Sequence, residues 1–150
     1  TSRRQRQMCI RDRIITLCVG LMSCGNNKTK NTENHTSTSI KDGVEVLYFH
    51  SKQRCATCLA IEKNAKEVIE TEFAEALKKG KLVFKSLEID ENESLSDKYE
   101  ITWSSLVLVD YDNGKESAEN LTEFAFANAR TAPDKFKAEI KSKIEKQLND

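Results

Sequence analysis

The residues with the clearest chemical potential are Cys55 and Cys58, which are spaced as Cys-Ala-Thr-Cys. They follow a run of strand-forming residues at 44–50 and stand at the start of a long helical pattern. A thiolate at a helix N-terminus lies among unpaired N–H groups at the positive end of the helix dipole, which favours its nucleophilic form. Two sulfurs on one turn can also form a disulfide without moving the fold, so the pair can carry two electrons per cycle. The pattern predicts thiol–disulfide exchange, with Cys55 attacking and Cys58 resolving.

Helical periodicity predicts how the two sulfurs are positioned. From Cys58 to a stop at Gly80, apolar residues recur at the period of one helix face. These residues are Ile61, Ala65, Val68, Ile69, Phe73, Ala76 and Leu77. Cys58 lies on this stripe whereas Cys55 precedes it, so we expect the second sulfur to be the more buried one.

The rest of the chain predicts an α/β domain over residues 43–150. Strands are expected at 44–50, 82–89 and 106–109, a short helix at 94–100, and an edge strand at 116–121 after the Asn113-Gly114 turn. Pro133 opens a last helix, and Phe124 and Phe126 add apolar surface without an assigned register. This order describes a central mixed sheet of about four strands flanked by helices on both sides.

The N-terminal segment resembles a targeting signal. Residues 14–22 form an apolar run behind Arg11 and Arg13, too short to span a bilayer, so residues 1–23 have the proportions of a signal peptide. The tetrad ending at Cys24 resembles a bacterial lipoprotein box, which predicts lipidation of Cys24. An ordinary cleaved signal is the alternative. Residues 1–13 also resemble a translated sequencing adaptor, and we assign them no function.

Residues 24–42 are predicted to be a flexible linker. Ten of the 18 residues from Gly25 to Asp42 are Ser, Thr or Asn, too polar to offset the entropy lost on ordering. Together with Cys24, this predicts a domain that contacts a membrane through a lipid anchor on the periplasmic side of a bacterial envelope.

Charge excludes one class of partner. The chain balances 24 basic against 24 acidic residues, but residues 1–23 hold five Arg and one Asp, leaving 19 against 23. The rest of the chain is therefore mildly acidic and has no cluster of Lys and Arg, so it offers no basic surface for binding nucleic acid. No flavin-binding signature is visible in the sequence either, and we expect no cofactor.

The predicted order of elements, with a CxxC at the first strand–helix junction, resembles the thioredoxin fold. More narrowly, residues 48–62 (YFHSKQRCATCLAIE), 103–109 (WSSLVLV) and 121–130 (LTEFAFANAR) resemble a Bacteroidetes family. That family is labelled a nitrophenyl compound nitroreductase subunit of arsenic-resistance clusters. The resemblance implies an envelope thioredoxin-like protein that takes electrons from a membrane thiol-electron transporter. It would pass them to a disulfide-bearing or reductase partner protein in a pathway that reduces nitroaromatics or organoarsenicals.

Two departures from thioredoxin concern the site. Thioredoxin-like proteins place a cis proline opposite the CxxC, and the resemblance puts Ser105 at that place because the sole proline is Pro133. They also carry a buried acid before the first cysteine, where Phe49 stands here. His50, Glu62 or water would have to accept the proton of the second thiol.

Supporting roles remain open at this point. Arg54 either favours the Cys55 thiolate or is a solvated charge. His50 is either a strand-end polar residue or a proton shuttle, and Trp103 is expected in a groove wall or the core. The rival function is a soft-metal or As(III)-binding module that uses the thiolates of Cys55 and Cys58. A third reading is a structural disulfide.

Overall fold

The computed structural model describes residues 42–149. The predicted signal peptide (1–23), the lipidation site Cys24 and the linker as far as residue 41 lie outside these residues, so they stay predictions. In chain order the elements are β1 (Gly43–His50), α1 (Ala56–Glu72), α2 (Ala74–Lys78), β2 (Leu82–Glu88), the 3-10 helix η1 (Ile89–Glu91), α3 (Glu93–Lys98), β3 (Ser105–Asp112), β4 (Lys115–Asn120), α4 (Thr122–Asn128) and α5 (Pro133–Asn149). Within residues 42–149, no helix combines the length and the apolarity needed to cross a membrane.

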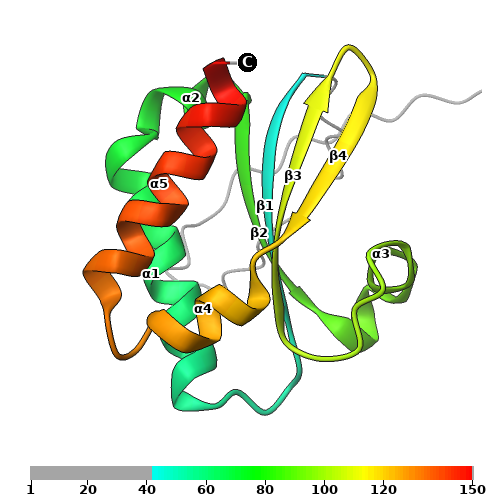
Figure 1. The fold of residues 1–150 in the computed structure, drawn as a ribbon. Helices are drawn as coiled ribbons and strands as arrows, with labels where there is room; N and C mark the ends of the chain where they lie inside the picture. The colour runs from blue at the N-terminus through cyan, green and yellow to red at the C-terminus, as the bar shows by residue number, and fades with distance from the viewer. Residues whose placement is uncertain (1–41, 150) are drawn as a thin grey trace, which may run out of the picture. The chain divides into compact units, whose positions relative to one another are not determined.

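The four strands form one mixed sheet in the order β2-β1-β3-β4. β1 pairs parallel with β2, and the pairs β1–β3 and β3–β4 are antiparallel. Helices α1, α2, α4 and α5 lie on one side of this sheet and α3 lies on the other (Figure 1). The predicted mixed sheet with helices on both sides is confirmed, and its arrangement is that of the thioredoxin-like fold.

Side chains of β1 alternate between two cores, which explains its nearly continuous apolar sequence. Val44, Val46 and Tyr48 point to the side of α1, which we call the α1 face. Leu47 and Phe49 point to the side of α3, the α3 face. The three α1-face residues of β1 pack against residues of α1, α4 and α5. The cluster on the α3 face is smaller, and Leu47 and Phe49 pack there with Leu87, Ile101, Val107 and Val109.

The helix predicted to run as far as Gly80 is interrupted. Phe73 leaves helical geometry, with φ −121° and ψ 26°, between α1 and α2. Its ring is buried in the α1-face core, so tertiary packing decides the break. Gly80, at φ +68°, ends α2 as predicted, and the N–H groups of Gly80 and Lys81 donate to the carbonyls of Leu77 and Ala76.

The segment that carries Phe124 and Phe126 forms helix α4, which the sequence did not predict. Thr122 fixes its start, because its hydroxyl accepts a hydrogen bond from the Leu106 N–H at 3.1 Å. Phe124 stacks on Phe136 of α5, with ring centroids 6.3 Å apart. Seven residues make fewer than two turns, so no period could be read from them.

The predicted turn at Asn113-Gly114 is confirmed. Both residues have positive φ values, 49° and 76°, which is the conformation that connects β3 to β4 tightly. The predicted edge strand is β4, and it ends one residue earlier than expected.

Candidate active site

Cys55 is the N-cap residue of α1 and is joined to Cys58 by a disulfide. Its extended backbone (φ −75°, ψ 164°) lets the Cys55 Sγ accept a hydrogen bond from the Cys58 N–H at 3.1 Å. Cys55 is exposed, whereas only 6% of Cys58 is exposed. The predicted difference in burial is therefore confirmed, and the helix N-terminus that favours a thiolate lies directly at Cys55.

Tyr48 anchors the first turn of α1 to the sheet. Its hydroxyl donates to the backbone carbonyl of Cys58 at 2.9 Å from a fully buried position on β1. Burial raises the pKa of Tyr48 to about 12, with Glu62 adding to the rise and Arg54 opposing it. Tyr48 therefore remains a protonated donor throughout the neutral pH range.

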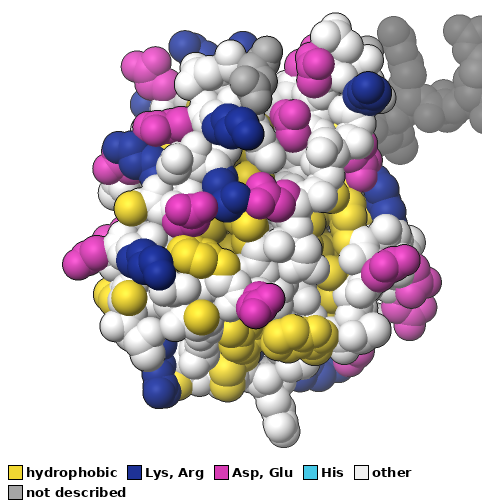
Figure 2. Space-filling model, viewed as in Figure 1, with side chains coloured by type: hydrophobic (Ala, Val, Ile, Leu, Met, Phe, Trp, Pro, Cys, Tyr) yellow, Lys and Arg dark blue, Asp and Glu magenta, His cyan; other side chains and the backbone are white. Residues whose placement is uncertain are grey.

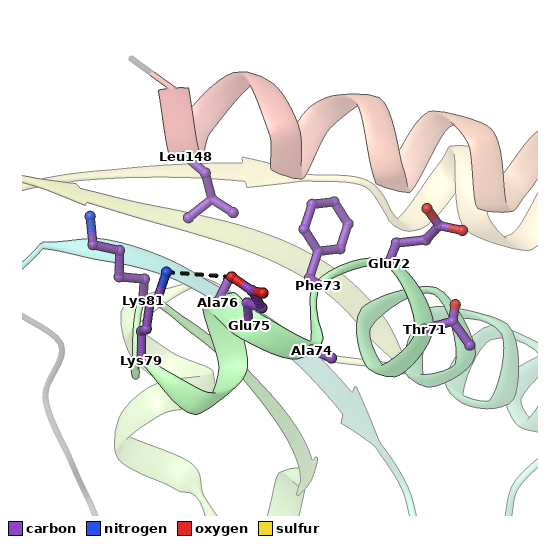
Figure 3. Close-up of a pocket in the computed structure, with 9 residues that line it drawn as sticks. All are labelled: Thr71, Glu72, Phe73, Ala74, Glu75, Ala76, Lys79, Lys81 and Leu148. Atoms are coloured by element: carbon purple, nitrogen blue, oxygen red, sulfur yellow. Dashed lines mark ion pairs between the residues drawn. The ribbon is translucent and has the colours of Figure 1, made fainter.

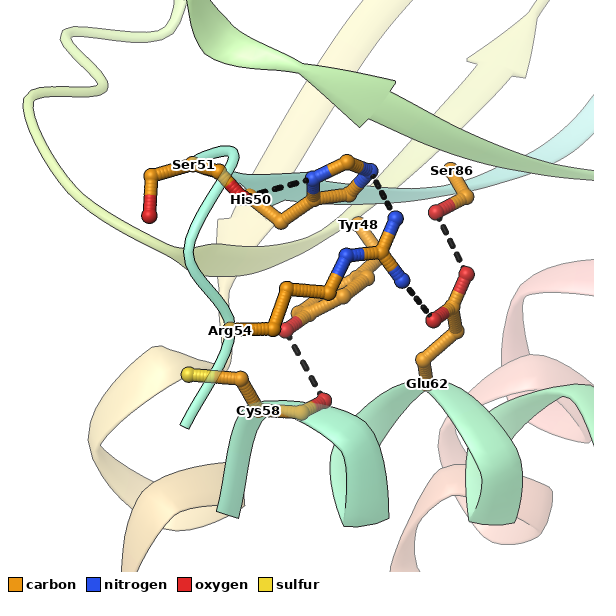
Figure 4. A network of polar contacts seen from close by, with 7 residues as sticks. All are labelled: Tyr48, His50, Ser51, Arg54, Cys58, Glu62 and Ser86. Atoms are coloured by element: carbon orange, nitrogen blue, oxygen red, sulfur yellow. Dashed lines mark hydrogen bonds and ion pairs between the residues drawn. The ribbon is translucent and has the colours of Figure 1, made fainter. Parts of the chain in front are cut away.

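A chain of polar side chains runs beside Cys58, between the sheet and α1 (Figure 4). The guanidinium group of Arg54 forms an ion pair with Glu62 and lies 2.5 Å from Nε2 of His50. Ser86 on β2 donates to the other oxygen of the Glu62 carboxylate at 2.6 Å. Four elements thus contribute to one network: β1, the CxxC loop, α1 and β2.

The contacts of His50 assign its tautomer. A guanidinium group only donates, so Nε2 of His50 must accept from Arg54. Nδ1 lies 3.2 Å from the carbonyl oxygen of Ser51, which only accepts, so Nδ1 carries the hydrogen. Both ring nitrogens of His50 therefore have a hydrogen-bond partner in the structure.

Neither expectation for Arg54 describes its position fully. The side chain is 26% exposed and paired with Glu62, so it is not a lone solvated charge. Its positive charge is also shared with that carboxylate rather than offered to Cys55 alone. Sequence reasoning considered Glu62 only as a proton acceptor and missed Tyr48 and Ser86. The available signal was Glu62 one helical turn after Cys58.

Ser105 opens β3 opposite Phe49. Alternation along β3 places it with Val107 on the α3 face, and its hydroxyl donates to the Trp103 carbonyl at 2.8 Å. The structure therefore does not bring Ser105 into the polar network on the α1 face. Phe49 stands where thioredoxin-like proteins carry a buried acid. It is buried on the α3 face and contributes only apolar packing.

Trp103 is a surface residue. Its side chain is 55% exposed and its ring lies 5.1 Å from that of Phe126, centroid to centroid. This exposure excludes the core position that was one of two expectations. Figure 2 shows hydrophobic side chains gathered over and beside α4 on the viewed face.

Metal ligands are scarce near the sulfurs. Between residues 42 and 149, no three His, Cys, Asp or Glu side chains converge on a common point. The soft-metal alternative therefore depends on the two sulfurs of Cys55 and Cys58.

One surface pocket lies at the opposite end of α1 from the disulfide (Figure 3). Phe73 and Leu148 line it together with the ion pair between Glu75 and Lys79, whose charged atoms are 3.5 Å apart. Its lining contains no cysteine or histidine, so we assign it no part in redox chemistry.

No protein-family model matches the chain, and no curated protein matches it in sequence. Solved structures similar to it include the thioredoxin of Fasciola hepatica, at 20% identity over 71% of this chain and 83% of that one (TM-score 0.45). The oxidised thioredoxin of Plasmodium falciparum is 20% identical over 69% and 83% of the two chains (TM-score 0.46). Mitochondrial thioredoxin 3 of Saccharomyces cerevisiae is 18% identical over 68% and 80% (TM-score 0.42).

These similarities are too distant to carry an argument about function. The strand order and the position of the CxxC define the class on their own: a thioredoxin-like fold with a Cys55–Cys58 pair at its first strand–helix junction.

Proposed function

We propose that this domain is a thiol–disulfide oxidoreductase in which Cys55 is the nucleophile and Cys58 the resolving thiol. The observation that carries the proposal is the contrast between an exposed sulfur at the helix N-cap and a buried one three residues later. The N-cap position favours the attacking thiolate, and burial of Cys58 reserves it for the intramolecular step.

The reaction balances as one electron pair per cycle. The thiolate of reduced Cys55 attacks a sulfur of the partner's disulfide, and the other partner sulfur leaves as a thiolate and takes up a proton. Cys58 then loses its proton and attacks Cys55 Sγ, which breaks the mixed disulfide and releases the second partner thiol. The partner gains two electrons and two protons, and the Cys55–Cys58 disulfide forms.

We further propose that the protein performs this exchange in the bacterial envelope, held by a lipid at Cys24. The predicted signal segment and lipoprotein box support this location. The family resemblance supports a membrane thiol-electron transporter as electron source and a nitroaromatic or organoarsenical pathway as destination. Because the dithiol carries one electron pair per cycle and a nitro group needs several to become an amine, its proposed role is electron delivery.

A redox titration of the full chain in glutathione buffers tests the exchange. Peptide mapping after alkylation separates Cys55 and Cys58 from the other cysteines, and a reversible two-electron transition of this pair is expected. The Cys58→Ser variant should trap a mixed disulfide through Cys55, whereas Cys55→Ser should trap none. Failure of the pair to oxidise reversibly would overturn the proposal. So would a mixed disulfide that forms through Cys58 in the Cys55→Ser variant.

The same titration separates the rival binding function. If both thiols resist oxidation and alkylation until a chelator is added, the pair is a soft-metal site instead.

A further inference from the structure

Two opposite charges lie beside the dithiol. Arg54 is the chain neighbour of Cys55, and Glu62 follows Cys58 by four residues on α1. Residues four apart on a helix lie on the same face, so the carboxylate belongs to the side of α1 that carries Cys58. The ion pair therefore joins the residue before the first cysteine to a residue one helical turn after the second, and Figure 4 shows it beside Cys58.

Both charges are held in place. The side chains of Arg54 and Glu62 are only 26% and 24% exposed. His50 accepts from Arg54 and Ser86 donates to Glu62, so each charged group has a second partner that fixes its orientation. Charges with this degree of burial are screened less by salt than those on an open surface.

Both charges affect the pKa of the Tyr48 hydroxyl, which donates a hydrogen bond to the Cys58 carbonyl. Glu62 raises the pKa of Tyr48 and Arg54 lowers it. An anion that formed on a nearby sulfur would meet the same two influences, with the same opposite signs.

We propose that the Arg54–Glu62 ion pair sets the reduction potential of the Cys55–Cys58 dithiol, Arg54 by stabilising the reduced thiolate and Glu62 by destabilising it. This inference rests on the proposed exchange function. Stabilising the thiolate favours the reduced form and makes the pair more oxidising. Since the charges are paired, each offsets the other, and the potential lies between the two values that either charge alone would impose.

Charge-removing variants test the inference, because they must act in opposite directions. In glutathione titration of the full chain, Arg54→Gln should make the pair more reducing and Glu62→Gln should make it more oxidising. We expect each to change the equilibrium constant with glutathione at least about threefold, which is ~14 mV for a two-electron couple. The double variant should return toward the wild type.

The matched control is Glu67→Gln on the same helix. Glu67 forms an ion pair with Lys137 at 2.6 Å on the exposed side of α1. Loss of this pair should leave the potential unchanged, because the charge lies away from the sulfurs. The rate of Cys55 alkylation as a function of pH gives a second readout. Its profile should move to higher pH in Arg54→Gln and to lower pH in Glu62→Gln.

The outcomes separate the two proposals. A wild type without a reversible transition overturns the exchange function itself. A reversible wild type whose two variants shift in the same direction, or do not shift, overturns only the role of the ion pair. If Arg54→Gln fails to fold, the sign of the Glu62→Gln shift decides: an oxidising shift supports the proposal, and no shift or a reducing one overturns it.

Discussion

The two faces of the sheet are stabilised by different means. On the α1 face, apolar residues of α1, α4 and α5 pack against β1 and β3 in one large cluster. On the α3 face, the short helices η1 and α3 cover a smaller cluster, and a buried carboxylate lies beside it. This carboxylate belongs to Glu45, which pairs with Lys85 at 2.8 Å and lies 3.5 Å from the Tyr111 hydroxyl.

This difference bears on the position of the CxxC. Helix α1 directs Ile61, Ala65, Val68 and Ile69 into the large core. The helix turn that contains Cys58 is therefore supported by a close-packed core of low compressibility. The α3 face adds an ion pair between Lys85 and the buried Glu45, beside its smaller apolar cluster. The turn that carries Cys58 is thus supported by the larger of the two apolar clusters.

The largest effect is expected from breaking the α1 face. Phe136 of α5 is fully buried, so Phe136→Ala should cost about 3–5 kcal/mol of unfolding free energy by leaving a cavity. Urea denaturation followed by circular dichroism measures this loss. Leu95→Ala on α3 is the matched change, and it should cost about 1 kcal/mol because Leu95 is only partly buried. Equal losses would contradict the asymmetry between the faces.

A middle-sized effect is expected from the buried carboxylate on the α3 face. Glu45→Gln removes the partner of Lys85 and should cost about 1–3 kcal/mol in the same urea experiment. Replacing the pair by Glu45→Leu and Lys85→Met together should restore stability or increase it, because the desolvation of both charges is removed. A double variant as unstable as the single one would show that the pair itself is not responsible.

The smallest effect is a loss of stability at alkaline pH. Burial raises the pKa of Tyr99 to about 12 and, chiefly by the same cause, also raises that of Tyr111. Because these folded-state values lie above the ordinary value of 10, the stability they contribute is complete below pH 10 and is lost as pH rises toward 12. Urea midpoints between pH 8 and 12 should fall less steeply in a Tyr99→Phe, Tyr111→Phe variant than in the wild type.

Tyr48→Phe is the control for this prediction. It removes the one tyrosine on the α1 face whose pKa is raised to about 12. The alkaline slope should therefore flatten less than in the double variant. A greater flattening would place the pH sensitivity on the α1 face.

Much of the fold was predictable because local patterns determine it. A run of strand-forming residues identified β1, a fully apolar run identified β3, and Asn113-Gly114 identified the hairpin. The break at Phe73 was not predictable, since it depends on where α1 meets the core. Helix α4 was too short to show a period.

The site was predictable in its sulfurs but only in part in its surroundings. The redox chemistry of the site could be predicted because Cys55 and Cys58 lie within four consecutive residues of the sequence. The contact of Arg54 with Glu62 crosses a non-helical loop, for which no spacing rule exists. The place of Ser86 follows from the pairing of Ser86 with Tyr48 in the sheet, which is known only once the strands are aligned.

The edge strand β4 has a consequence for behaviour in crowded surroundings. All six of its residues are exposed, and an outer strand offers unpaired N–H and C=O groups to any extended chain it meets. Here that edge is charged: Lys115, Glu116 and Glu119 lie along it, and Glu116 is engaged by Lys98 at 2.5 Å. Charges at such an edge disfavour strand addition, so this side of the domain resists amyloid-like self-association.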